Sequence, residues 1–466
     1  MSFSPRVHKC IDSVTPTPRK CPSVMGFSRK SRCFIRWSCK SQFQSVLDLT
    51  FSRMSRFRKC RQRGRRRWKA GANMGTLSEA VRVSHRGSDR LRHVGKALAA
   101  GMFALTLAAC ASTPAPTSGN APVDQKSLDE AKNAVKQYTD PAADFTGPKT
   151  GFPVGDKKSV VFVSCAATIA LCNDAGAAVK DAAQTLGWNV NVIDGGGTAT
   201  GWLDAMNKAI ALHPDAIIEA AISPDAVPEP FKRAKEAGIP VVSLFASGSP
   251  GPIDTAGVFY NEDTDGAAVG TAMAQYAVAD SGGRARVVII YDNTYAIARA
   301  KNDAMKKVIE ACSSCQLLED VSTPFGELSK NVPGLLSGWL SKYSGEPLYV
   351  LSVGDIAFDT MIPTLNSRGV KAGEVKLIGA DGSAAAYQRI RDGKFQVTTV
   401  PQPVREMAYN AVDQVTRALN SQPAVSWSPV PFLVTRDNVN DAGGDQNRYE
   451  PANGYADQYK KIWGIS

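Results

Sequence analysis

Histidine is scarce in this chain of 466 residues, and the scarcity limits the chemistry that the protein can perform. The chain has four histidines, and only His213 follows residue 110. One histidine is too few for most four-ligand zinc sites, and the sequence has no Gly-x-Ser-x-Gly nucleophile elbow. The glycine run 195–197 precedes no Gly-Lys-Ser/Thr and is therefore not a phosphate loop. We accordingly expect no catalysis, no metal and no other cofactor.

Acidic residues are nearly missing from the first 73 residues, which contain 19 lysines and arginines against Asp12 and Asp48. The rest of the chain has 36 basic and 41 acidic residues, so the net charge of +12 comes from this segment. A nucleic-acid-binding tail is one interpretation, but the segment has no sustained apolar period. We expect residues 1–89 to be disordered, or to be upstream sequence ahead of a true start such as Met74, and we expect no nucleic-acid partner.

Long hydrophobic runs are missing as well. The apolar stretch 97–109 follows a basic segment and is shorter than the ~20 residues that a membrane span needs. A short apolar core after basic residues is typical of a secretory signal peptide. The stretch ends in Leu-Ala-Ala-Cys at 107–110, which resembles the lipobox of bacterial lipoproteins. The resemblance implies a signal over 90–110, acylation of Cys110, and a periplasmic or cell-surface protein anchored to the outer or cytoplasmic membrane.

Cysteine use after Cys110 is sparse and fits export. Only Cys165, Cys172, Cys312 and Cys315 follow, and an oxidising compartment favours pairing between neighbours, 165 with 172 and 312 with 315. The Cys-Ser-Ser-Cys spacing of the second pair also occurs in redox and zinc motifs, but no second such pair follows. We therefore expect either a local disulfide or two free thiols there.

From residue 159 onward, short β-rich runs alternate with amphipathic helical patterns. The runs are mostly continuous and apolar, as expected of strands that are buried on both faces of a parallel sheet. About 300 residues of such alternation exceed one domain, so we predict an α/β protein with two doubly wound parallel-sheet lobes. The predicted strands are 159–165, 188–194, 215–222, 239–245, 285–291, 348–353, 375–380 and 396–400, and the clearest helices are 173–186, 226–237, 296–312 and 356–368.

Several short motifs make the sequence recognisable. Residues 237–242 read AGIPVV, 378–382 read IGADG, and 391–394 read RDGK ahead of TVPQP at 399–403. An Ala-Arg pair at 298–299 opens a helix. In this order and spacing, the motifs resemble the type I periplasmic binding proteins, the ribose-binding-like group that shares its fold with lactose-repressor-type transcription factors. The resemblance covers roughly residue 157 to the C-terminus.

The family resemblance implies two lobes joined by a three-segment hinge, with the ligand bound in the cleft between them. The segment before the lobes is rich in Pro, Thr, Ser, Ala and Asp, which predicts a linker that is partly helical near 126–138. The expected parts are a linker at 111–156, a first lobe at 157–260 plus 403–430, and a second lobe at 262–400 plus 433–466.

The same resemblance implies an extracytoplasmic binding protein that delivers a small polar ligand, a sugar or polyol, to the permease subunits of an ABC uptake transporter. We expect it to be a monomer. A ligand sensor that partners a chemoreceptor or sensor kinase is the alternative, because the partner's face lies on another chain. A repressor would need an N-terminal helix-turn-helix where this chain has its expected signal.

Four residues match ligand positions of the family. Asp381 follows a strand at the edge where an α/β sheet opens its crevice, and its carboxylate would accept two hydroxyls. Arg299 would donate a fork of hydrogen bonds, and the Gln402 amide could both donate and accept. Phe325 would stack on the ligand's apolar face. Each residue also has a purely structural alternative. Asp381 could cap the next helix, and Arg299 could be a surface residue of its helix. Gln402 could cap the backbone of the hinge, and Phe325 could belong to the core.

The first lobe departs from the family pattern, so about half of the usual polar contacts to a sugar are missing. Phe245 stands where Asp-Arg is usual, and Ser223 replaces an asparagine. In the second lobe Gly354, beside Asp355, replaces another asparagine. We nevertheless include Ser223, Phe245 and Asp355 among the candidate ligand contacts. Trp202, in the glycine-rich loop, is either a further contact or a packing residue at a helix start.

Overall fold

The computed structural model describes residues 122–140, 144–152, 155 and 157–465 of the chain. These residues belong to the unit Cys110–Ser466, one of two into which the chain divides. The expected basic segment, signal peptide and lipobox, including Cys110, lie outside the described residues. No helix in the described part of the chain is long and apolar enough to cross a membrane.

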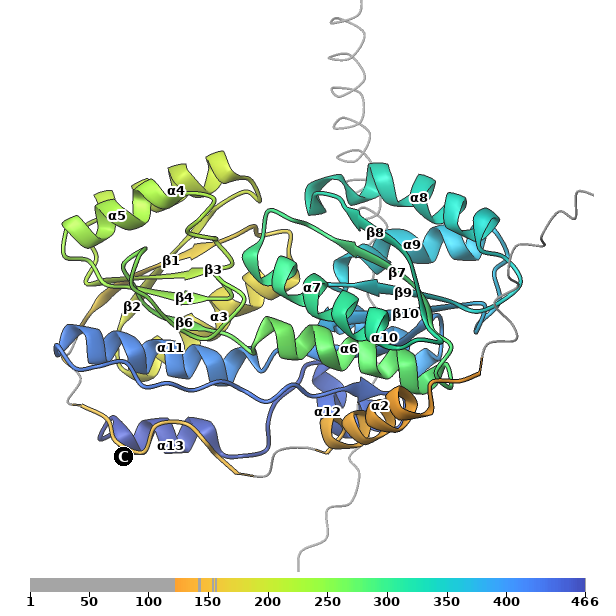
Figure 1. Cartoon of the computed structure of the whole chain (residues 1–466). Helices are drawn as coiled ribbons and strands as arrows, with labels where there is room; N and C mark the ends of the chain where they lie inside the picture. Colours follow the sequence, from red (N-terminus) through yellow and green to blue (C-terminus); the bar gives the residue numbers. More distant parts are fainter. Residues whose placement is uncertain (1–121, 141–143, 153–154, 156, 466) are drawn as a thin grey trace, which may run out of the picture. The chain divides into compact units, whose positions relative to one another are not determined.

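The first lobe is built on a six-stranded sheet in the order β2-β1-β3-β4-β6-β5, which is parallel except for β5. Burial on both faces explains its apolar sequence, because helices cover it on either side (Figure 1). The strands are β1 (Ser159–Ser164), β2 (Asn189–Asp194), β3 (Ala216–Ala220), β4 (Val241–Leu244), β5 (Gly251–Ile253) and β6 (Val258–Glu262). The covering helices are α3 (Ala170–Thr185) and α11 (Val404–Leu419) on one face, and α4 (Ala199–Ala211) and α5 (Pro228–Glu236) on the other.

The second lobe repeats this plan with a sheet in the order β12-β11-β10-β9-β7-β8, in which only β12 is antiparallel. Helices α6 and α7 lie on one face, and α8 and α9 pack on the other (Figure 1). The strands are β7 (Arg286–Tyr291), β8 (Gln316–Ser322), β9 (Leu348–Ser352), β10 (Val375–Asp381), β11 (Gln396–Pro401) and β12 (Val434–Thr435). The helices are α6 (Gly266–Asp280), α7 (Ala296–Ala311), α8 (Leu328–Lys342), α9 (Ile356–Ser367) and α10 (Ala384–Asp392).

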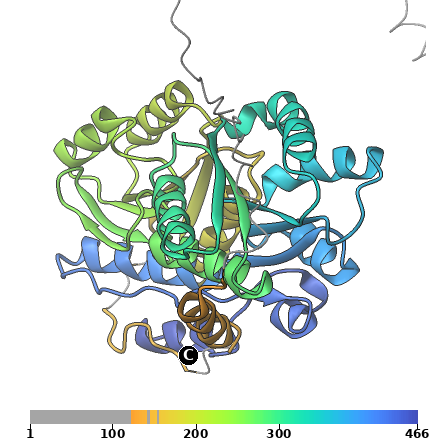
Figure 2. The same cartoon turned by 45° about the vertical axis from the view of Figure 1, so that its right-hand side comes forward.

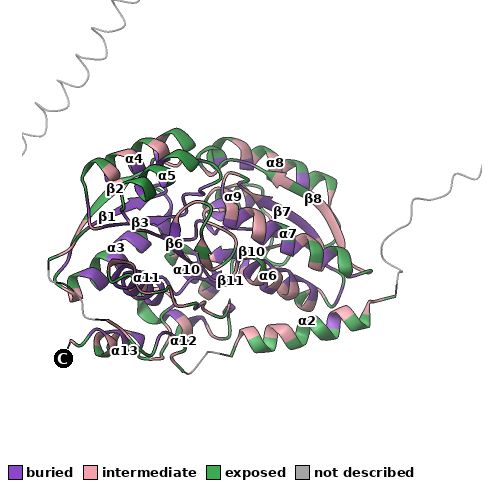
Figure 3. Cartoon of the chain, turned by 60° about the vertical axis from the view of Figure 1, so that its left-hand side comes forward, coloured by how far each residue is buried: buried purple, intermediate pink, exposed green. Residues whose placement is uncertain are grey.

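The chain passes between the lobes three times, as expected for a three-segment hinge. It passes from β6 to α6, from β11 to α11, and from α11 to β12. Each lobe is therefore built from separate stretches of the sequence, with α11 returning to the first lobe and β12 to the second. In Figure 3 the strands are mostly buried, whereas the outer helices alternate between buried and exposed residues, which is the pattern of two doubly wound lobes.

The segment expected to be a linker is not free where the structure describes it. Helix α2 (Gln125–Tyr138) packs on α6, and Figures 1 and 2 both show the two helices side by side. Leu128 and Ala131, one turn apart, are buried in this contact. The described residues 144–152 then reach the first lobe, where Phe145 packs edge-on against Tyr459 with ring centroids 5.4 Å apart.

The turn between Cys312 and Cys315 anchors the start of α2. The structure joins these two cysteines by a disulfide, and also Cys165 to Cys172. The Asp124 carboxylate caps α2 by accepting from the Ser127 backbone N–H at 3.1 Å. It also accepts from the Ser313 N–H at 3.1 Å, and these hydrogen bonds lower the pKa of Asp124 to about 2. The two serines of the Cys-Ser-Ser-Cys turn thus have a docking role, since Ser314 accepts from the Asp124 N–H at 2.8 Å.

The C-terminal residues differ from the expected lobe boundary, which placed 433–466 wholly in the second lobe. β12 does pair with β11, but α13 (Tyr455–Ile462) packs on α11 of the first lobe. The Tyr459 hydroxyl donates to Asn410 at 2.9 Å, and the Trp463 ring stacks on Tyr409 at 5.6 Å. Together with Tyr455, which packs edge-on against Tyr409, three buried aromatic residues of the tail lie on α11 and bring the chain back to the first lobe.

We expect Leu128→Ala to destabilise the protein by about 2 kcal/mol, because it removes a side chain buried between α2 and α6. Urea unfolding at equilibrium measures the change. Lys132→Ala, at an exposed position of the same helix, is the matched control and should alter the free energy of unfolding by less than about 0.5 kcal/mol. Equal stability of Leu128→Ala and the parent would show that α2 is not docked in solution.

Candidate functional site

A small cavity of about 80 Å³ lies where loops of the two lobes meet. Its walls come from the loop after β1, the carboxyl ends of β9 and β10, the hinge after β11, and the C-terminal segment. The carboxyl edge of parallel strands is the usual ligand side of an open α/β sheet. The lining residues are Thr168, Ile169, Ala170, Leu171, Asp174, Phe325, Asp355, Ile356, Asp359, Asp381, Gly382, Ser383, Gln402, Val404 and Arg448.

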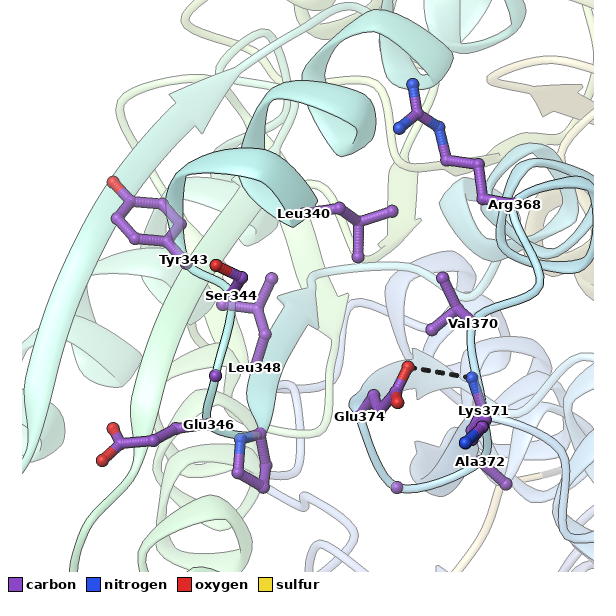
Figure 4. Close-up of a pocket in the computed structure, with 13 residues that line it drawn as sticks. Leu340, Tyr343, Ser344, Glu346, Leu348, Arg368, Val370, Lys371, Ala372 and Glu374 are labelled. Atoms are coloured by element: carbon purple, nitrogen blue, oxygen red, sulfur yellow. Dashed lines mark hydrogen bonds between the residues drawn. The ribbon is translucent and has the colours of Figure 1, made fainter.

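A larger cavity of about 640 Å³ lies elsewhere, at the amino end of β9. Figure 4 shows Leu340 and Val370 on either side of it, with Glu374 accepting a hydrogen bond from the Lys371 backbone N–H at 3.0 Å. This end of the sheet holds none of the predicted ligand residues. We therefore take the smaller cavity as the candidate site.

Asp381 emerges at the end of β10 with a left-handed backbone, φ +85°. Its carboxylate Oδ1 accepts from the Lys301 ammonium at 2.9 Å, and Lys301 also donates to the Val353 carbonyl at 3.1 Å. Lys301 is only 2% exposed, so the pair is largely removed from water on the lysine side. Gly270 of α6 makes this arrangement possible, because a Cβ there would lie 2.2 Å from the Lys301 carbonyl oxygen. Close packing of α6 on α7 thus places Lys301.

Sequence reasoning missed Lys301, although a signal was present. Ile297, Lys301 and Met305 are spaced by four residues on α7, and all three are buried. A lysine in an apolar stripe requires a buried partner, because burying an unpaired ammonium is costly. The stripe therefore could have pointed to a carboxylate such as Asp381.

Asp355 lines the cavity, but its carboxylate is fully used by the protein. Oδ2 accepts from the backbone N–H groups of Gly382 and Ser383 at 2.9 and 3.0 Å, and from the Thr399 hydroxyl at 3.0 Å. Oδ1 accepts from the Gln396 amide at 2.7 Å. Burial raises the pKa of Asp355 to about 7 in spite of these donors. Asp355 thus holds the loop after β10 in place.

Gln402 and Phe325 both line the cavity. Gln402 is 2% exposed, and neither its amide nitrogen nor its amide oxygen has a hydrogen-bond partner among the described residues. Phe325 stacks on Tyr295, with ring centroids 5.6 Å apart. Gly354 lies beside both Phe325 and Asp381, because an added Cβ there would meet Asp381 Oδ2 at 3.0 Å and Phe325 Cζ at 3.7 Å.

Arg299 and Ser223 are not among the cavity-lining residues. The Arg299 guanidinium forms an ion pair with Asp225 of the first lobe and donates to the Asn293 carbonyl at 2.7 Å. The Ser223 hydroxyl accepts from the Ala296 backbone N–H at 2.9 Å. Both residues therefore connect the lobes at the start of α7.

Phe245 and Trp202 are fully buried in the first-lobe core and do not line the cavity. Phe245 follows β4 with φ +64°, and its N–H donates to the Glu262 carbonyl at 2.9 Å. The Trp202 indole N–H donates to the Cys165 carbonyl at 2.9 Å, and its ring meets Tyr295 edge-on at 5.2 Å. Trp202 thus supports the loop after β1 from behind.

The loop closed by the Cys165–Cys172 disulfide supplies the first-lobe wall of the cavity. Four of its residues, 168–171, line the cavity, and three of them are apolar. Asp174, shortly after this loop, also lines the cavity, and so does Arg448 of the C-terminal segment. Sequence reasoning missed both residues. Neither residue lies in a recognisable motif. No group of His, Cys, Asp and Glu in the described ranges could hold a metal ion.

Comparison with known proteins agrees with this architecture. The model of the periplasmic binding protein domain family matches residues 160–423. Among curated proteins no sequence match is found.

Solved structures of similar fold include three sugar- or polyol-bound proteins. An ABC transporter solute binding protein from Agrobacterium vitis with bound allitol is 22% identical, with a TM-score of 0.53 over 61% of this chain and 98% of that one. The Caulobacter myo-inositol binding protein is 20% identical, with a TM-score of 0.55 over 62% and 97%. An ABC transporter solute binding protein from Burkholderia graminis in complex with D-arabinose is 18% identical, with a TM-score of 0.55 over 62% and 98%. At these identities the likeness shows the shared fold.

A buried carboxyl beneath the first-lobe edge gives a pH-dependent prediction. Glu219 of β3 is fully buried, and burial raises its pKa to about 8, above the unfolded value near 4.5. The folded state therefore binds this proton more tightly than the unfolded state does. The resulting contribution of Glu219 to the free energy of unfolding is fully present below pH 4.5 and is lost as the pH rises towards 8. Glu219→Gln should reduce the fall in unfolding free energy between pH 5 and pH 8 by on the order of 3 kcal/mol.

Urea unfolding at a series of pH values measures this slope. The exposed Glu229→Gln in the same lobe is the control and should leave the slope unchanged. The unfolding free energy of Glu219→Gln should still fall somewhat with rising pH, because burial also raises the pKa of Glu406 to about 7. A parent protein whose stability does not fall between pH 5 and 8 would contradict the prediction.

Proposed function

Because the chain belongs to the periplasmic binding protein domain family, which matches it over residues 160–423, we propose that it is an extracytoplasmic solute-binding protein. It delivers a small polar ligand, a sugar or polyol, to an ABC uptake transporter. The bound allitol, myo-inositol and D-arabinose of the structurally similar proteins support this ligand class. The family is one of binding proteins, and the chain acts by binding and release rather than by catalysis.

One observation carries the proposal most directly. The Gln402 amide is buried at the cavity with no partner among the described residues, and leaving a buried polar group unpaired costs about 1–3 kcal/mol. A hydroxyl-bearing ligand would satisfy both of its polar atoms, because a hydroxyl can donate and accept. The Asp381 carboxylate lines the same cavity, with Oδ2 left over from the Lys301 contact, and Phe325 offers a ring face. A sugar or polyol site needs a small number of well-placed polar groups beside an aromatic ring face.

The cavity is too small for a sugar unless the lobes separate. Its volume of about 80 Å³ is well below the ~300–1,000 Å³ of typical small-molecule sites. The lobes touch through Arg299–Asp225 and through Ser223–Ala296, at the front of the cleft. We propose that these contacts open and close as the ligand enters, and that Arg299 and Ser223 act on closure.

Membrane attachment is part of the proposed function. Acylation of Cys110 would tether the protein through residues 111–121, after which the chain reaches the docked helix α2. Mass spectrometry of the protein isolated from membranes should show an acylated N-terminus at Cys110 and no peptide from residues 1–73. Cys110→Ser should release the protein from the membrane fraction. An exported protein that retains residues 1–73 would contradict the signal assignment.

A ligand panel tests the binding function. We expect allitol, myo-inositol, D-arabinose or a related compound to raise the melting temperature, because a ligand that binds only the folded state stabilises it. Asp381→Asn should then weaken binding by about 100-fold in calorimetry, since a partly buried charged acceptor is lost and the buried Lys301 ammonium is left without its counter-ion.

Asp303→Asn, at an exposed position of α7 near Lys301, is the matched control and should bind as the parent does. If no sugar or polyol stabilises the parent, the ligand class is wrong. If one does and Asp381→Asn binds it equally tightly, the function stands but the site assignment fails.

A further inference from the structure

The C-terminal segment, which lies beyond the family match at residue 423, returns from the second lobe to the first. It leaves β12, forms α12 (Val439–Gly443) against α10, and ends as α13 on α11. Figure 1 shows this chain passing from α12 to α13 beneath the two lobes. The part between these helices brings Arg448 to the wall of the cavity that contains Asp381 and Gln402.

The backbone on either side of Arg448 is held firmly by the second lobe. Arg391 of α10 donates to the side-chain oxygens of Asn440 and Asn447 at 2.9 and 2.8 Å. Just after Arg448, the Tyr449 ring stacks on Phe432 at 4.8 Å with an interplanar angle of 6°. The position of Arg448 is thus fixed by neighbours rather than by its own side chain.

Gly443 contributes to the same attachment through close packing. A Cβ at this position would lie 2.2 Å from the Tyr387 ring, so only glycine lets the segment approach α10 so closely. Tyr387 itself is fully buried and does not yield easily. The segment is therefore fixed on the second lobe at Gly443, and Arg448 follows five residues after this glycine.

The Arg448 guanidinium has hydrogen-bonding capacity to spare. Its Nε is buried and has no hydrogen-bond acceptor among the described residues. The Glu450 carboxylate stands 3.6 Å from Nε, beyond hydrogen-bond distance, and Nη2 donates to Gln446 at 3.3 Å. A buried N–H without an acceptor costs free energy, and a ligand oxygen in the cavity would remove that cost.

The charges around the cavity favour a neutral, oxygen-rich ligand over an ion. Asp381 is paired with Lys301, and Asp359 is paired with Arg389 at 2.6 Å. Asp174 of the first lobe lies in the field of Arg448, which lowers its pKa against the larger, opposite effect of burial. With Asp355 in the lining and Glu450 beside Arg448, the acidic groups at this wall outnumber the basic ones by five to three, which disfavours an anionic ligand.

We propose that Arg448 is a ligand-contacting residue that helps to set the selectivity of this cavity, by donating its guanidinium fork to two adjacent hydroxyl oxygens of a polyol or sugar. A planar guanidinium matches two neighbouring oxygens better than an ammonium does. Arg448 is the only arginine among the lining residues, whereas the Arg299 guanidinium is bonded to Asp225. This inference rests on the proposed function and adds to it a residue from outside the family domain.

Three variants of the full-length mature protein test the inference. Arg448→Met keeps much of the side-chain length but removes the fork, and Arg448→Lys keeps only the charge. The control is Arg233→Met, which removes an exposed guanidinium on α5, a helix that does not line the cavity. Calorimetry with allitol, myo-inositol, D-arabinose and D-gluconate measures binding, and urea unfolding checks that each variant is folded.

The reference ligand is the neutral compound that binds the parent protein most tightly. We expect Arg448→Met to bind it about 10-fold more weakly or worse, and Arg448→Lys to bind it with an affinity between those of the parent and Arg448→Met. Arg233→Met should bind as the parent does. If a neutral compound binds the parent and Arg448→Met equally, the inference is wrong and the proposed function stands. If only D-gluconate binds, and binding depends on Arg448, the guanidinium pairs with a carboxylate and the proposed diol contact is wrong. If nothing binds the parent, the proposed function fails and this inference fails with it.

Discussion

The buried carboxylate of Asp355 is the interaction on which the geometry of the second-lobe edge depends. It accepts hydrogen bonds from the loop after β10, through Gly382 and Ser383, and from β11, through Gln396 and Thr399. A single carboxylate, just after β9, thus ties the loop after β10 to the neighbouring strand β11. Removing one partner of such a network leaves the others unsatisfied in a low-dielectric interior, where each costs about 1–3 kcal/mol. Asp381 can therefore hold its left-handed backbone and present its carboxylate to the cavity.

The side-chain contacts between the lobes at the start of α7 are individually weak. The Arg299–Asp225 pair is partly exposed, with side chains 37% and 62% accessible, and exposed pairs contribute about 0–1 kcal/mol. The hydrogen bond from Ala296 to Ser223 adds a net contribution of about 1 kcal/mol. In the proposed function, a ligand that formed hydrogen bonds with Gln402 and Arg448 would gain a comparable free energy. Such a ligand would be able to shift a balance between open and closed forms of the protein.

Much of the fold could be predicted because buried parallel strands leave continuous apolar runs. β8 escaped prediction because it is an edge strand with polar residues and few fully buried positions. α6 escaped for the opposite reason, since small apolar residues occur all around it and leave no helical period. The helix expected near 126–138 is present as α2, but its packing on α6, like that of α13 on α11, joins segments that are distant in sequence and was not predicted.

The site could be predicted only in part, for related reasons. Asp381 and Gln402 stand in motifs at strand ends, so their shared edge followed from topology, whereas Phe325 was expected only from the family resemblance. The pairing of Arg299 with Asp225 depends on how the lobes meet, and local sequence carries no trace of it. Lys301 left a signal in its apolar stripe. Arg448 left none, because its position results from contacts with α10 that span more than fifty residues.

The two segments outside the family match form one connected layer, and this links the tether to the hinge. The Leu433 backbone N–H donates to the Tyr138 carbonyl at 2.8 Å, so the end of α2 meets the third crossing between the lobes. Farther on, Arg417 of α11 donates to the Thr150 carbonyl, which fixes the N-terminal segment to the first lobe. A segment fastened to both lobes must shift when they rotate, because its ends cannot follow two bodies at once. In the proposed function, rotation of the lobes would move the attachment points of this segment relative to each other, and ligand binding would then be coupled to the segment that follows the expected lipid anchor.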